Sequence, residues 1–579
     1  MGLIKIQSFS FLFTILIITS SSLSHHHQHH SRSKRHNRRN SQLNIYRPSF
    51  YTPSSTLSGE WVLLHDSIGI SAMHMQLLYN NKVVIFDRTD FGASNLSLPN
   101  GKCRYNDEAL PNGVDCTAHS ILYDVLSNTY RPLMVQTDVW CSSGAVNSNG
   151  TLIQTGGYHA GDRKIRFFSP CNDGDDSCDW TELEQNLTVQ RWYSSDHLLP
   201  DGRVIIVGGR RAFSYEFFPK NGDNNEVFDL PFLKETTDPK EENNLYPFLY
   251  ILPDGNLYIF ANQRSIVLDY VNNKVLKEFP VIPGEKRSYP ATGSSVMLPL
   301  ILNSARVLTV EVMMCGGAWG GAYVNAMKGV FWRASNTCGR LRITDPDPKW
   351  VMEDMPMGRV MPDMLLLPTG DVIILNGASN GAAGWENAVD PVLNPVLYKL
   401  YETDPDKRFI VLNPTNIPRM YHSSATLLPD GRILVGGSNP HVRYNFTGVK
   451  YPTELSLEAF SPPYAATQYS PIKPSIIAVE GQIMGVLSYG QQFSITFTLG
   501  YPGEELMVSM VAPSFTTHSF GMNQRLLFLE IVDIKGLSMF NYKVTMFAPT
   551  SKNIAPPGYY MVFVVHQGVP SHSVWVRLQ

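Results

Sequence analysis

The chain has 579 residues, of which 43% are hydrophobic and 17% charged, and its formal net charge is −3. This length exceeds what a single hydrophobic core normally serves, so we expect more than one domain. Residues 1–40 carry six basic and no acidic side chains; the rest of the chain has 41 basic and 50 acidic residues, a net charge of −9. Such a mildly acidic body argues against nucleic acid as a partner.

The N-terminal segment resembles a secretory signal. Residues 1–24 contain Lys5, the apolar run FSFLFTILII and a small-residue stretch that ends near Ser24, which predicts a signal peptide. The apolar run is shorter than the roughly 20 residues that span a bilayer, and no later segment qualifies, so we expect no membrane insertion. Residues 25–45 are basic, His-rich and poor in apolar side chains, which predicts a disordered leader. We therefore expect a secreted protein of the extracellular space or cell wall.

The cysteines fit an oxidising compartment. Three pairs each enclose a short turn-rich segment and would form local disulfides: Cys103 with Cys116, Cys171 with Cys178, and Cys315 with Cys338. Cys141 is the seventh cysteine and has no partner. A buried thiol or an intermolecular link would be the ordinary interpretation of such a residue.

A cassette of a turn followed by a β-branched run organises the chain from about 46 to 465. Its copies begin at Asn80, Asn149, Asp201, Asp254, Ser304, Thr369 and Asp430. A turn flanked by β-formers is a hairpin, and hairpins that recur every ~50 residues are typical of kelch-type propeller blades. Seven copies predict a seven-bladed β-propeller over 46–465.

The cassette is absent from the C-terminal region. Residues 466–579 contain short alternating segments such as GQQFSITFTL, RLLFLEI and YYMVFVV. This pattern is typical of an antiparallel β-sandwich of about seven strands. The fold class is therefore all-β, with a propeller followed by a sandwich.

The register of the repeat predicts a site. Five residues lie nine positions before the glycine of their cassette: Cys141, Tyr193, Tyr246, Met361 and His422. Equivalent positions of successive blades are related by the radial repeat, so these side chains should form a ring at one mouth of the central channel. Tyr421 lies one residue from this ring.

The ring residues suit a redox metal. Phenol and imidazole groups are poor core residues unless polar partners are present, whereas imidazole nitrogen and phenolate oxygen suit Cu(II). A second imidazole would improve the site, and His518 in APSFTTHSFGMNQR of the C-terminal region is the candidate. A redox-inert metal such as zinc is the alternative occupant.

Four separated motifs resemble those of a known family. VWCSSG at Cys141, RWYSS at Tyr193, RMYHSS at Tyr421-His422 and TTHSFGMNQR at His518 are similar, in order, to the active-site motifs of the copper radical oxidases. This group contains the galactose and glyoxal oxidases, and the resemblance spans nearly the whole mature chain. It implies a seven-bladed kelch propeller with an immunoglobulin-like C-terminal domain.

The resemblance also implies a mechanism. Cys141 and Tyr193 would be joined by a thioether bond, which makes a radical cofactor from side chains. Tyr193, His422 and His518 would surround the copper in a plane, while Tyr421 would lie axially and act as general base. Dioxygen would be the electron acceptor and hydrogen peroxide a product.

One departure from the family affects the expected substrate. Galactose-oxidising members carry a tryptophan that stacks over the thioether, and Arg211 falls at that position here. We therefore expect oxidation of small hydrated aldehydes to carboxylic acids, with oxidation of primary alcohols of galactosides as the alternative. A non-catalytic kelch binding module is the alternative from another class. We expect a monomer.

Other aromatic and histidine residues are expected to have lesser roles. Tyr246 and Tyr289 would either line the substrate mouth or pack the channel. Trp140 and Trp192 would form a wall beside the site. Four histidines show no ligand spacing and are predicted to lie at the surface or in turns: His74, His119, His159 and His197.

Overall fold

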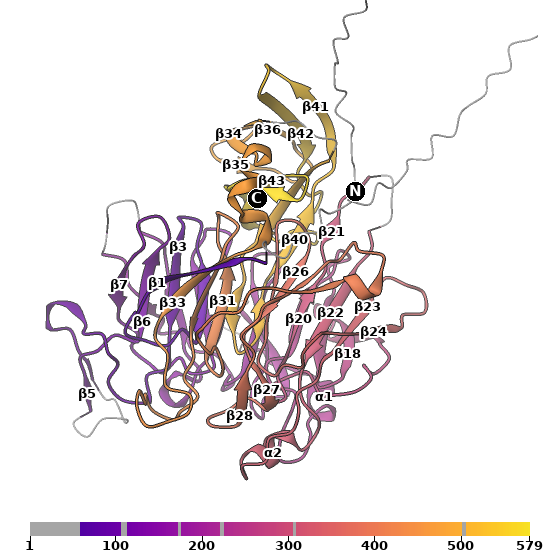
Figure 1. Ribbon diagram of the computed structural model, residues 1–579. Helices are drawn as coiled ribbons and strands as arrows, with labels where there is room; N and C mark the ends of the chain where they lie inside the picture. The colour runs from indigo at the N-terminus through magenta and orange to yellow at the C-terminus, as the bar shows by residue number, and fades with distance from the viewer. Residues whose placement is uncertain are drawn as a thin grey trace, which may run out of the picture.

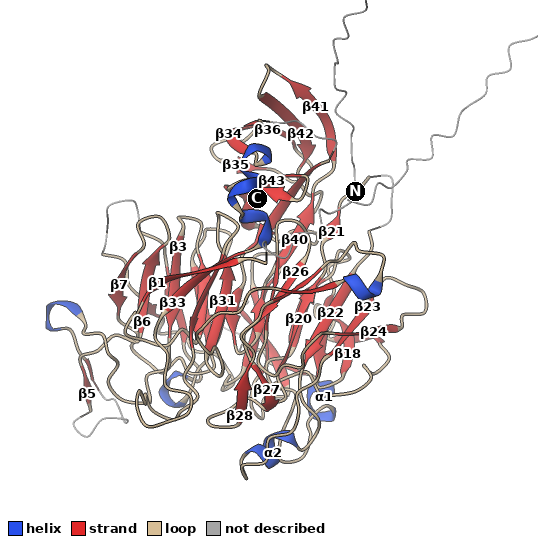
Figure 2. Ribbon diagram, in the orientation of Figure 1, coloured by secondary structure: helices blue, strands red, loops and turns tan. Residues whose placement is uncertain are grey.

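The computed structural model describes residues 58–105, 113–171, 175, 177–220, 225–304, 308–500 and 505–579. The signal peptide predicted at 1–24 and the leader predicted at 25–45 lie outside these ranges. Strands dominate the described ranges, whose α-helices are α1 (Pro231–Glu235) and α2 (Ala322–Ala326) (Figure 2). Short 3-10 turns occur at η1 (Pro99–Gly101), η2 (His159–Gly161), η3 (Pro405–Lys407), η4 (Pro463–Ala465) and η5 (Thr467–Ile472). None of these helices is long and apolar enough to cross a membrane.

Seven four-stranded antiparallel units form a β-propeller, one for each predicted cassette (Figure 1). Blade 1 is β2 (His74–Leu77), β3 (Lys82–Phe86), β6 (Ser120–Asp124) and β7 (Thr129–Leu133). Blade 2 is β8 (Ser143–Val146), β9 (Leu152–Thr155), β10 (Ile165–Phe168) and β11 (Thr181–Glu182). Blade 3 is β12 (Ser194–Leu198), β13 (Val204–Gly208), β14 (Ser214–Phe218) and β15 (Phe228–Asp229). Blades 4 and 5 are β16 (Phe248–Ile251), β17 (Leu257–Ala261), β18 (Arg264–Asp269) and β19 (Lys274–Glu278); β20 (Gly293–Met297), β22 (Glu311–Gly316), β23 (Thr337–Arg342) and β24 (Trp350–Asp354).

The last two blades complete the ring. Blade 6 is β25 (Asp363–Leu366), β26 (Val372–Leu375), β29 (Val396–Tyr398) and β30 (Phe409–Val411), and blade 7 is β31 (Ser423–Leu427), β32 (Ile433–Gly437), β33 (Leu457–Ser461) and β1 (Glu60–His65). Blade 7 thus takes its outer strand β1 from the N-terminal side of the described chain, paired antiparallel with β33. Because this pairing joins distant parts of the chain, it closes the ring of blades. Two small hairpins lie outside the blades: β4 (Arg104–Tyr105) with β5 (Val114–Asp115), and β27 (Ala378–Gly381) with β28 (Ala388–Pro391).

The cassette glycine explains the shape of each inner hairpin. It lies in the turn between the first and second strands of a blade, with φ near +90° at Gly150, Gly202, Gly255, Gly370 and Gly431 (85°, 90°, 91°, 88° and 87°). Glycine adopts this left-handed region without the steric cost that a Cβ atom brings. The strands that follow are β-branched and buried, as VIIVG in β13 is, so one short sequence specifies both the turn and the core strand.

The C-terminal region forms two sheets that stand at one end of the propeller (Figure 1). One sheet has the order β34 (Ser475–Glu480), β36 (Gln492–Thr498), β42 (Asn541–Phe547), β41 (Ile531–Gly536). The other has the order β21 (Leu300–Ile301), β40 (Arg525–Phe528), β37 (Leu506–Ala512), β43 (Gly558–His566), β45 (Val574–Leu578), β35 (Val486–Leu487), with β44 (Val569–Pro570) on β43. Strand β21 comes from blade 5, so the two domains share a sheet.

A hairpin of the C-terminal region enters the propeller channel. Strand β38 (Phe515–Thr517) pairs with the innermost strand of blade 1, β2, and β39 (Phe520–Met522) pairs with β38. Strand β38 also lies against β8 and β31, and β39 lies against β12, β16, β20 and β25, so the hairpin contacts the first strand of all seven blades. Phe515, Phe520 and Met522 are fully buried there. Burial of each such side chain is worth roughly 2 kcal/mol, which holds the hairpin in place.

The three predicted disulfides are present, and they link Cys103 to Cys116, Cys171 to Cys178, and Cys315 to Cys338. Cys141 is free and buried. Its neighbours at the end of the propeller channel are described below.

Candidate metal centre at the end of the channel

The predicted ring exists as a repeated backbone conformation. Cys141, Tyr193, Tyr246, Met361 and His422 all have positive φ, between 49° and 66°, just before the first strand of their blades. The Tyr193 N–H donates to the Cys141 carbonyl (2.9 Å), and the Tyr246 N–H donates to the Tyr193 carbonyl (3.0 Å). A non-glycine residue in this region costs on the order of 1 kcal/mol. The packing of the surrounding blades holds each of these residues in the left-handed conformation, and the same turn recurs in successive blades around the axis.

Blade 5 contributes a ring residue that the sequence prediction missed. Thr292 has φ of 44°, precedes β20 and accepts a hydrogen bond from the Met361 N–H (2.8 Å). The cassette at Ser304 is a loose copy that lacks a glycine nine residues after Thr292. Register counting from the glycine therefore could not find it.

His518 occupies the tip of the channel hairpin. It forms the turn with Ser519 between Thr517 and Phe520, and both turn residues have positive φ (44° and 72°). A two-residue loop of this kind matches the twist of the flanking strands. The Thr517 hydroxyl lies 2.7 Å from His518 Nδ1, which orients the ring and leaves Nε2 free to face the channel.

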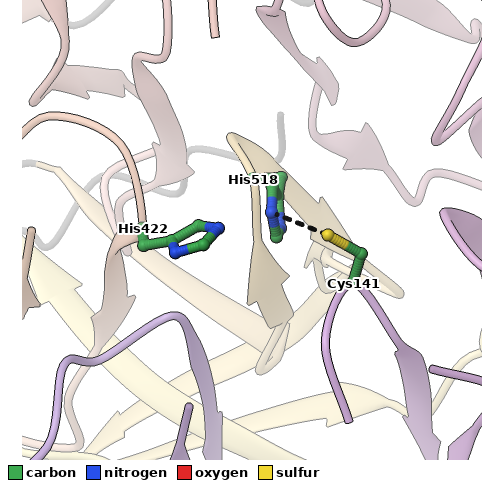
Figure 3. Close-up of side chains that lie close together, drawn as sticks. All are labelled: Cys141, His422 and His518. Carbon is green, nitrogen blue, oxygen red and sulfur yellow. Dashed lines mark hydrogen bonds between the residues drawn. The ribbon is translucent and has the colours of Figure 1, made fainter. Parts of the chain in front are cut away.

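Cys141, His422 and His518 meet at this tip (Figure 3). His518 lies between the other two, with its Nε2 3.2 Å from Cys141 Sγ and its ring centroid 5.0 Å from that of His422. One ligand atom from each of the three lies within 4.8 Å of those of the other two. All three side chains are buried, so three segments far apart in the sequence converge on one enclosed point.

The two predicted tyrosines lie beside these residues. The Tyr421 ring stacks on His422 at 3.9 Å between centroids, and it lies 5.7 Å from His518. The Tyr193 ring lies 5.9 Å from His518. The structure thus brings together all five residues that the sequence singled out.

The electrostatics leave the imidazoles as neutral ligands. Burial lowers the pKa of His422 and His518 well below the usual value, with smaller contributions from neighbouring imidazoles and, for His422, from Arg88. Both ring nitrogens of His422 are buried without a hydrogen-bond partner in the described part of the chain. Because buried polar atoms are almost always satisfied, these orphaned nitrogens fit a metal ion. The donor set of imidazoles and phenols fits Cu(II) in particular.

The remaining groups hold their protons in this structure. Burial raises the pKa of the Cys141 thiol well above its usual value, against the opposing effect of a hydrogen bond with Tyr193. Burial likewise raises the pKa of the Tyr193 and Tyr421 phenols well above their usual values. Deprotonation of either phenol therefore needs a cation or a covalent change nearby.

An aromatic wall borders the Tyr193 side of the site. Trp192 lies 4.8 Å from Tyr193, and Trp140 lies 4.9 Å from Trp192. Trp140 stacks on Trp385 at 5.0 Å, and the Arg88 guanidinium lies over both indoles. The wall role predicted for Trp140 and Trp192 agrees with these contacts, whereas Trp385 and Arg88 carried no sequence signal.

Arg211 does not occupy the position expected for it. Its side chain is exposed and its φ is 63°. Arg210 instead lies over the Trp192 ring at 5.3 Å and pairs with Glu242 at 3.1 Å. The left-handed turn at Arg211 sends the preceding residue, not Arg211, toward the aromatic wall.

The prediction for the four other histidines is wrong for three of them. His74, His119 and His197 are buried, and only His159 is exposed. His74 stacks on Phe86 at 4.3 Å, and burial lowers its pKa to about 3. His119 lies 2.7 Å from an Asp115 carboxylate oxygen. Local spacing does not reveal these positions: His74 and His197 lie in the buried strands β2 and β12, and His119 lies just before β6.

The fold and the site together define a propeller oxidase, and comparison with known proteins places the chain among them. A family model described as glyoxal oxidase N-terminus matches residues 73–464, and one described as galactose oxidase-like, early set domain matches residues 473–578. The chain belongs to the glyoxal oxidase family, within the copper radical oxidases, as the motifs predicted.

Individual relatives agree with this placement. The chain is 44% identical over 541 residues to aldehyde oxidase GLOX1 of Arabidopsis thaliana, covering 91% of this chain and 85% of the relative. It is also 44% identical over 530 residues to aldehyde oxidase GLOX of Vitis pseudoreticulata, covering 90% and 97%. A solved fungal alcohol oxidase of the AA5 family, in complex with copper, matches 90% of this chain and all of its own with a TM-score of 0.68 at 18% identity. That structural likeness shows the fold, and the predicted fold class is confirmed.

Proposed function

We propose that the chain is a secreted copper-dependent oxidase that converts small hydrated aldehydes to carboxylic acids and reduces dioxygen to hydrogen peroxide. The overall reaction is balanced: a hydrated aldehyde loses two hydrogens to dioxygen. The convergence of Cys141, His422 and His518 with Tyr193 and Tyr421 at the hairpin tip carries the proposal. The aldehyde oxidase names of the relatives support the substrate class.

Four side chains would hold the copper: Tyr193, Tyr421, His422 and His518. Bound Cu(II) would supply a one-electron redox partner and a Lewis acid beside the phenols. The orphaned nitrogens of His422 and the Nε2 of His518, freed by the Thr517 contact, support the imidazole assignments. The propeller, proposed at 46–465, would contribute three of these ligands, and the C-terminal domain, proposed at 466–579, would contribute the fourth.

Cys141 and Tyr193 would form the organic part of the cofactor. A bond between the sulfur and the ring carbon ortho to the hydroxyl forms with loss of the S–H and C–H hydrogens, and their two electrons and two protons pass to dioxygen as hydrogen peroxide. The backbone hydrogen bond between the two residues keeps them adjacent. Delocalisation onto sulfur would then ease loss of one electron from the phenol ring.

The chain's own residues would divide the work on the substrate. Tyr421 would take the hydroxyl proton of the hydrated aldehyde as general base, and the oxidised Tyr193 would take the hydrogen atom from carbon. Thr292, Met361 and Ala383 line the small cavity beside Tyr421, His422 and His518. A mouth lined by such small or apolar residues suits a small aldehyde better than a sugar. The Trp140–Trp192 wall would shield the radical from water.

The test is peroxide release by copper-loaded protein across a panel of aldehydes, primary alcohols and galactosides. We expect one peroxide per aldehyde consumed, and a polypeptide lighter by two hydrogens than its composition with the three disulfides formed predicts. Cys141→Ser should lose both properties. If wild type shows neither the mass change nor peroxide with any substrate, the chain is a binding module or a site for an inert metal such as zinc, and the proposal is wrong. Preference for galactosides would replace the aldehyde assignment.

A further inference from the structure

The Tyr289 hydroxyl links the two tyrosines of the site. It lies 3.1 Å from the Tyr193 hydroxyl and 2.8 Å from the Tyr421 hydroxyl. A phenol has one hydrogen to donate and lone pairs to accept, so Tyr289 can donate to one neighbour and accept from the other. The three phenols therefore form one continuous chain inside the channel.

Tyr289 is held by its backbone bridge to Leu245 and by a ring contact with Tyr193. Its N–H donates to the Leu245 carbonyl (3.2 Å), and the two residues form an isolated bridge. Leu245 precedes Tyr246, whose N–H donates to the Tyr193 carbonyl. The Tyr289 ring lies 4.6 Å from the Tyr193 ring, with a 30° angle between the planes. Tyr289 is thus attached to the same backbone ring as Tyr193, and only 8% of it is exposed.

Few groups restrain the Tyr193 hydroxyl in its buried environment, so its hydrogen bond to Tyr289 affects its position. Besides Tyr289, the Tyr193 hydroxyl has the Cys141 thiol and the Tyr421 hydroxyl as side-chain hydrogen-bond partners among the described residues. A phenol that swings about its side-chain torsions would change both its approach to Cys141 and its separation from Tyr421. Tyr289 opposes that swing through its hydroxyl at one end and its ring along one face.

We propose that Tyr289 is a positioning residue that fixes the Tyr193 and Tyr421 oxygens relative to each other and holds the Tyr193 ring against Cys141 for bond formation. The inference rests on the proposed function. It assigns Tyr289 no contact with the reacting carbon. Its action is mechanical: two hydrogen bonds and one ring contact restrict the phenol before the sulfur–carbon bond exists.

The variant Tyr289→Phe tests this because it keeps the ring and removes only the hydroxyl. Each lost hydrogen bond is worth a factor of about two to ten. We expect copper-free full-length protein to acquire the Cys141–Tyr193 bond about five- to tenfold more slowly than wild type after copper and dioxygen are added. Intact mass and gel mobility follow the bond without reference to turnover. Copper affinity, measured by competition with a chelator, should weaken by a similar factor.

The matched control is Tyr250→Phe. Tyr250 is equally buried in the channel, and its hydroxyl donates to Ser295 Oγ at 2.9 Å without contact to the site phenols. It should lower the unfolding midpoint as Tyr289→Phe does and leave bond formation and copper affinity unchanged. Wild-type rates and affinity in Tyr289→Phe would overturn the inference while the proposed function stands. Equal slowing in both variants would show a general packing effect and would also overturn it. Failure of wild type to form the bond would instead refute the proposed function.

Discussion

Blades 2, 3 and 7 share one backbone conformation with blades 4, 5 and 6 at the ring position, yet only the first three contribute residues assigned to the metal centre. The first group presents Cys141, Tyr193 and His422, and the second presents Tyr246, Thr292 and Met361, all six with positive φ. The repeated turn therefore supplies equivalent positions around the channel mouth. Proximity to His518 does not separate the two groups, because its ring lies 5.1 Å from Tyr246 and 5.9 Å from Tyr193. The hydroxyl contacts separate the two tyrosines: Tyr246 donates to the Ser142 carbonyl, whereas the Tyr193 hydroxyl faces the Tyr289 hydroxyl.

Tyr193 and Tyr246 offer the sharpest test of this comparison, because they are the same residue type at the same register. Tyr193→Phe should lower peroxide output by more than about a thousandfold, as loss of a residue in the reacting unit does in other enzymes. Tyr246 donates its hydroxyl to the Ser142 carbonyl (3.0 Å), so Tyr246→Phe should instead cost about 1 kcal/mol of unfolding free energy. Urea unfolding and a peroxide assay measure the two effects. Equal losses of peroxide would contradict the division between the blades.

The hairpin tip is the next largest test. His518→Ala should weaken copper binding by more than about a hundredfold, since even the supporting partners of metal ligands matter on that scale. His197→Gln removes another buried histidine, one whose Nδ1 lies 2.8 Å from the Leu198 carbonyl. This control should lose stability and keep copper affinity. Chelator competition on both variants gives the result, and unchanged affinity in His518→Ala would exclude the hairpin from the centre.

A buried acid in blade 6, Asp363, is expected to affect the free energy of unfolding and not the activity. Burial raises the pKa of Asp363 to about 7, although the Asn376 amide donates to it at 2.7 Å. The folded state then binds a proton that the unfolded state has released, so this group's contribution to the unfolding free energy falls as pH rises from about 4 to about 7. Asp363→Asn should flatten that pH dependence by more than about 1 kcal/mol. Urea unfolding at several pH values checks it, and an unchanged slope would rule out the buried acid.

The smallest expected effect separates two neighbouring arginines. Both side chains are exposed, but Arg210 lies over the Trp192 ring at 5.3 Å, and Arg211 has no cation–aromatic contact in the described part of the chain. An exposed cation–aromatic contact is worth about 0.5–1 kcal/mol, so Arg210→Gln should change KM about two- to fivefold, and Arg211→Gln should not change it. Steady-state kinetics with the best aldehyde of the panel distinguishes them. The reverse ranking would restore the position that the family pattern suggested for Arg211.

Much of the site could be predicted because several of its residues occupy the same position in successive copies of the repeat. The interval between ring residue and glycine is the same in five blades, so a count along the chain identified Cys141, Tyr193 and His422. Thr292 escaped because its cassette is irregular, and Trp385 because it lies outside the repeat. The buried His74 and His197 were misjudged since their burial depends on neighbouring blades and on the channel hairpin.

The sequence by itself determined the seven blades, the three disulfides, the unpaired Cys141 and the register that aligns the ring, because each depends on local turns, strand periodicity or short spacing. Only the tertiary structure decided that Tyr289 bridges Tyr193 and Tyr421, that Arg210 replaces Arg211 at the aromatic wall, and that His518 reaches the ring. These depend on how a closed ring of blades packs around an inserted hairpin, and such contacts between distant segments leave no periodic trace along the chain.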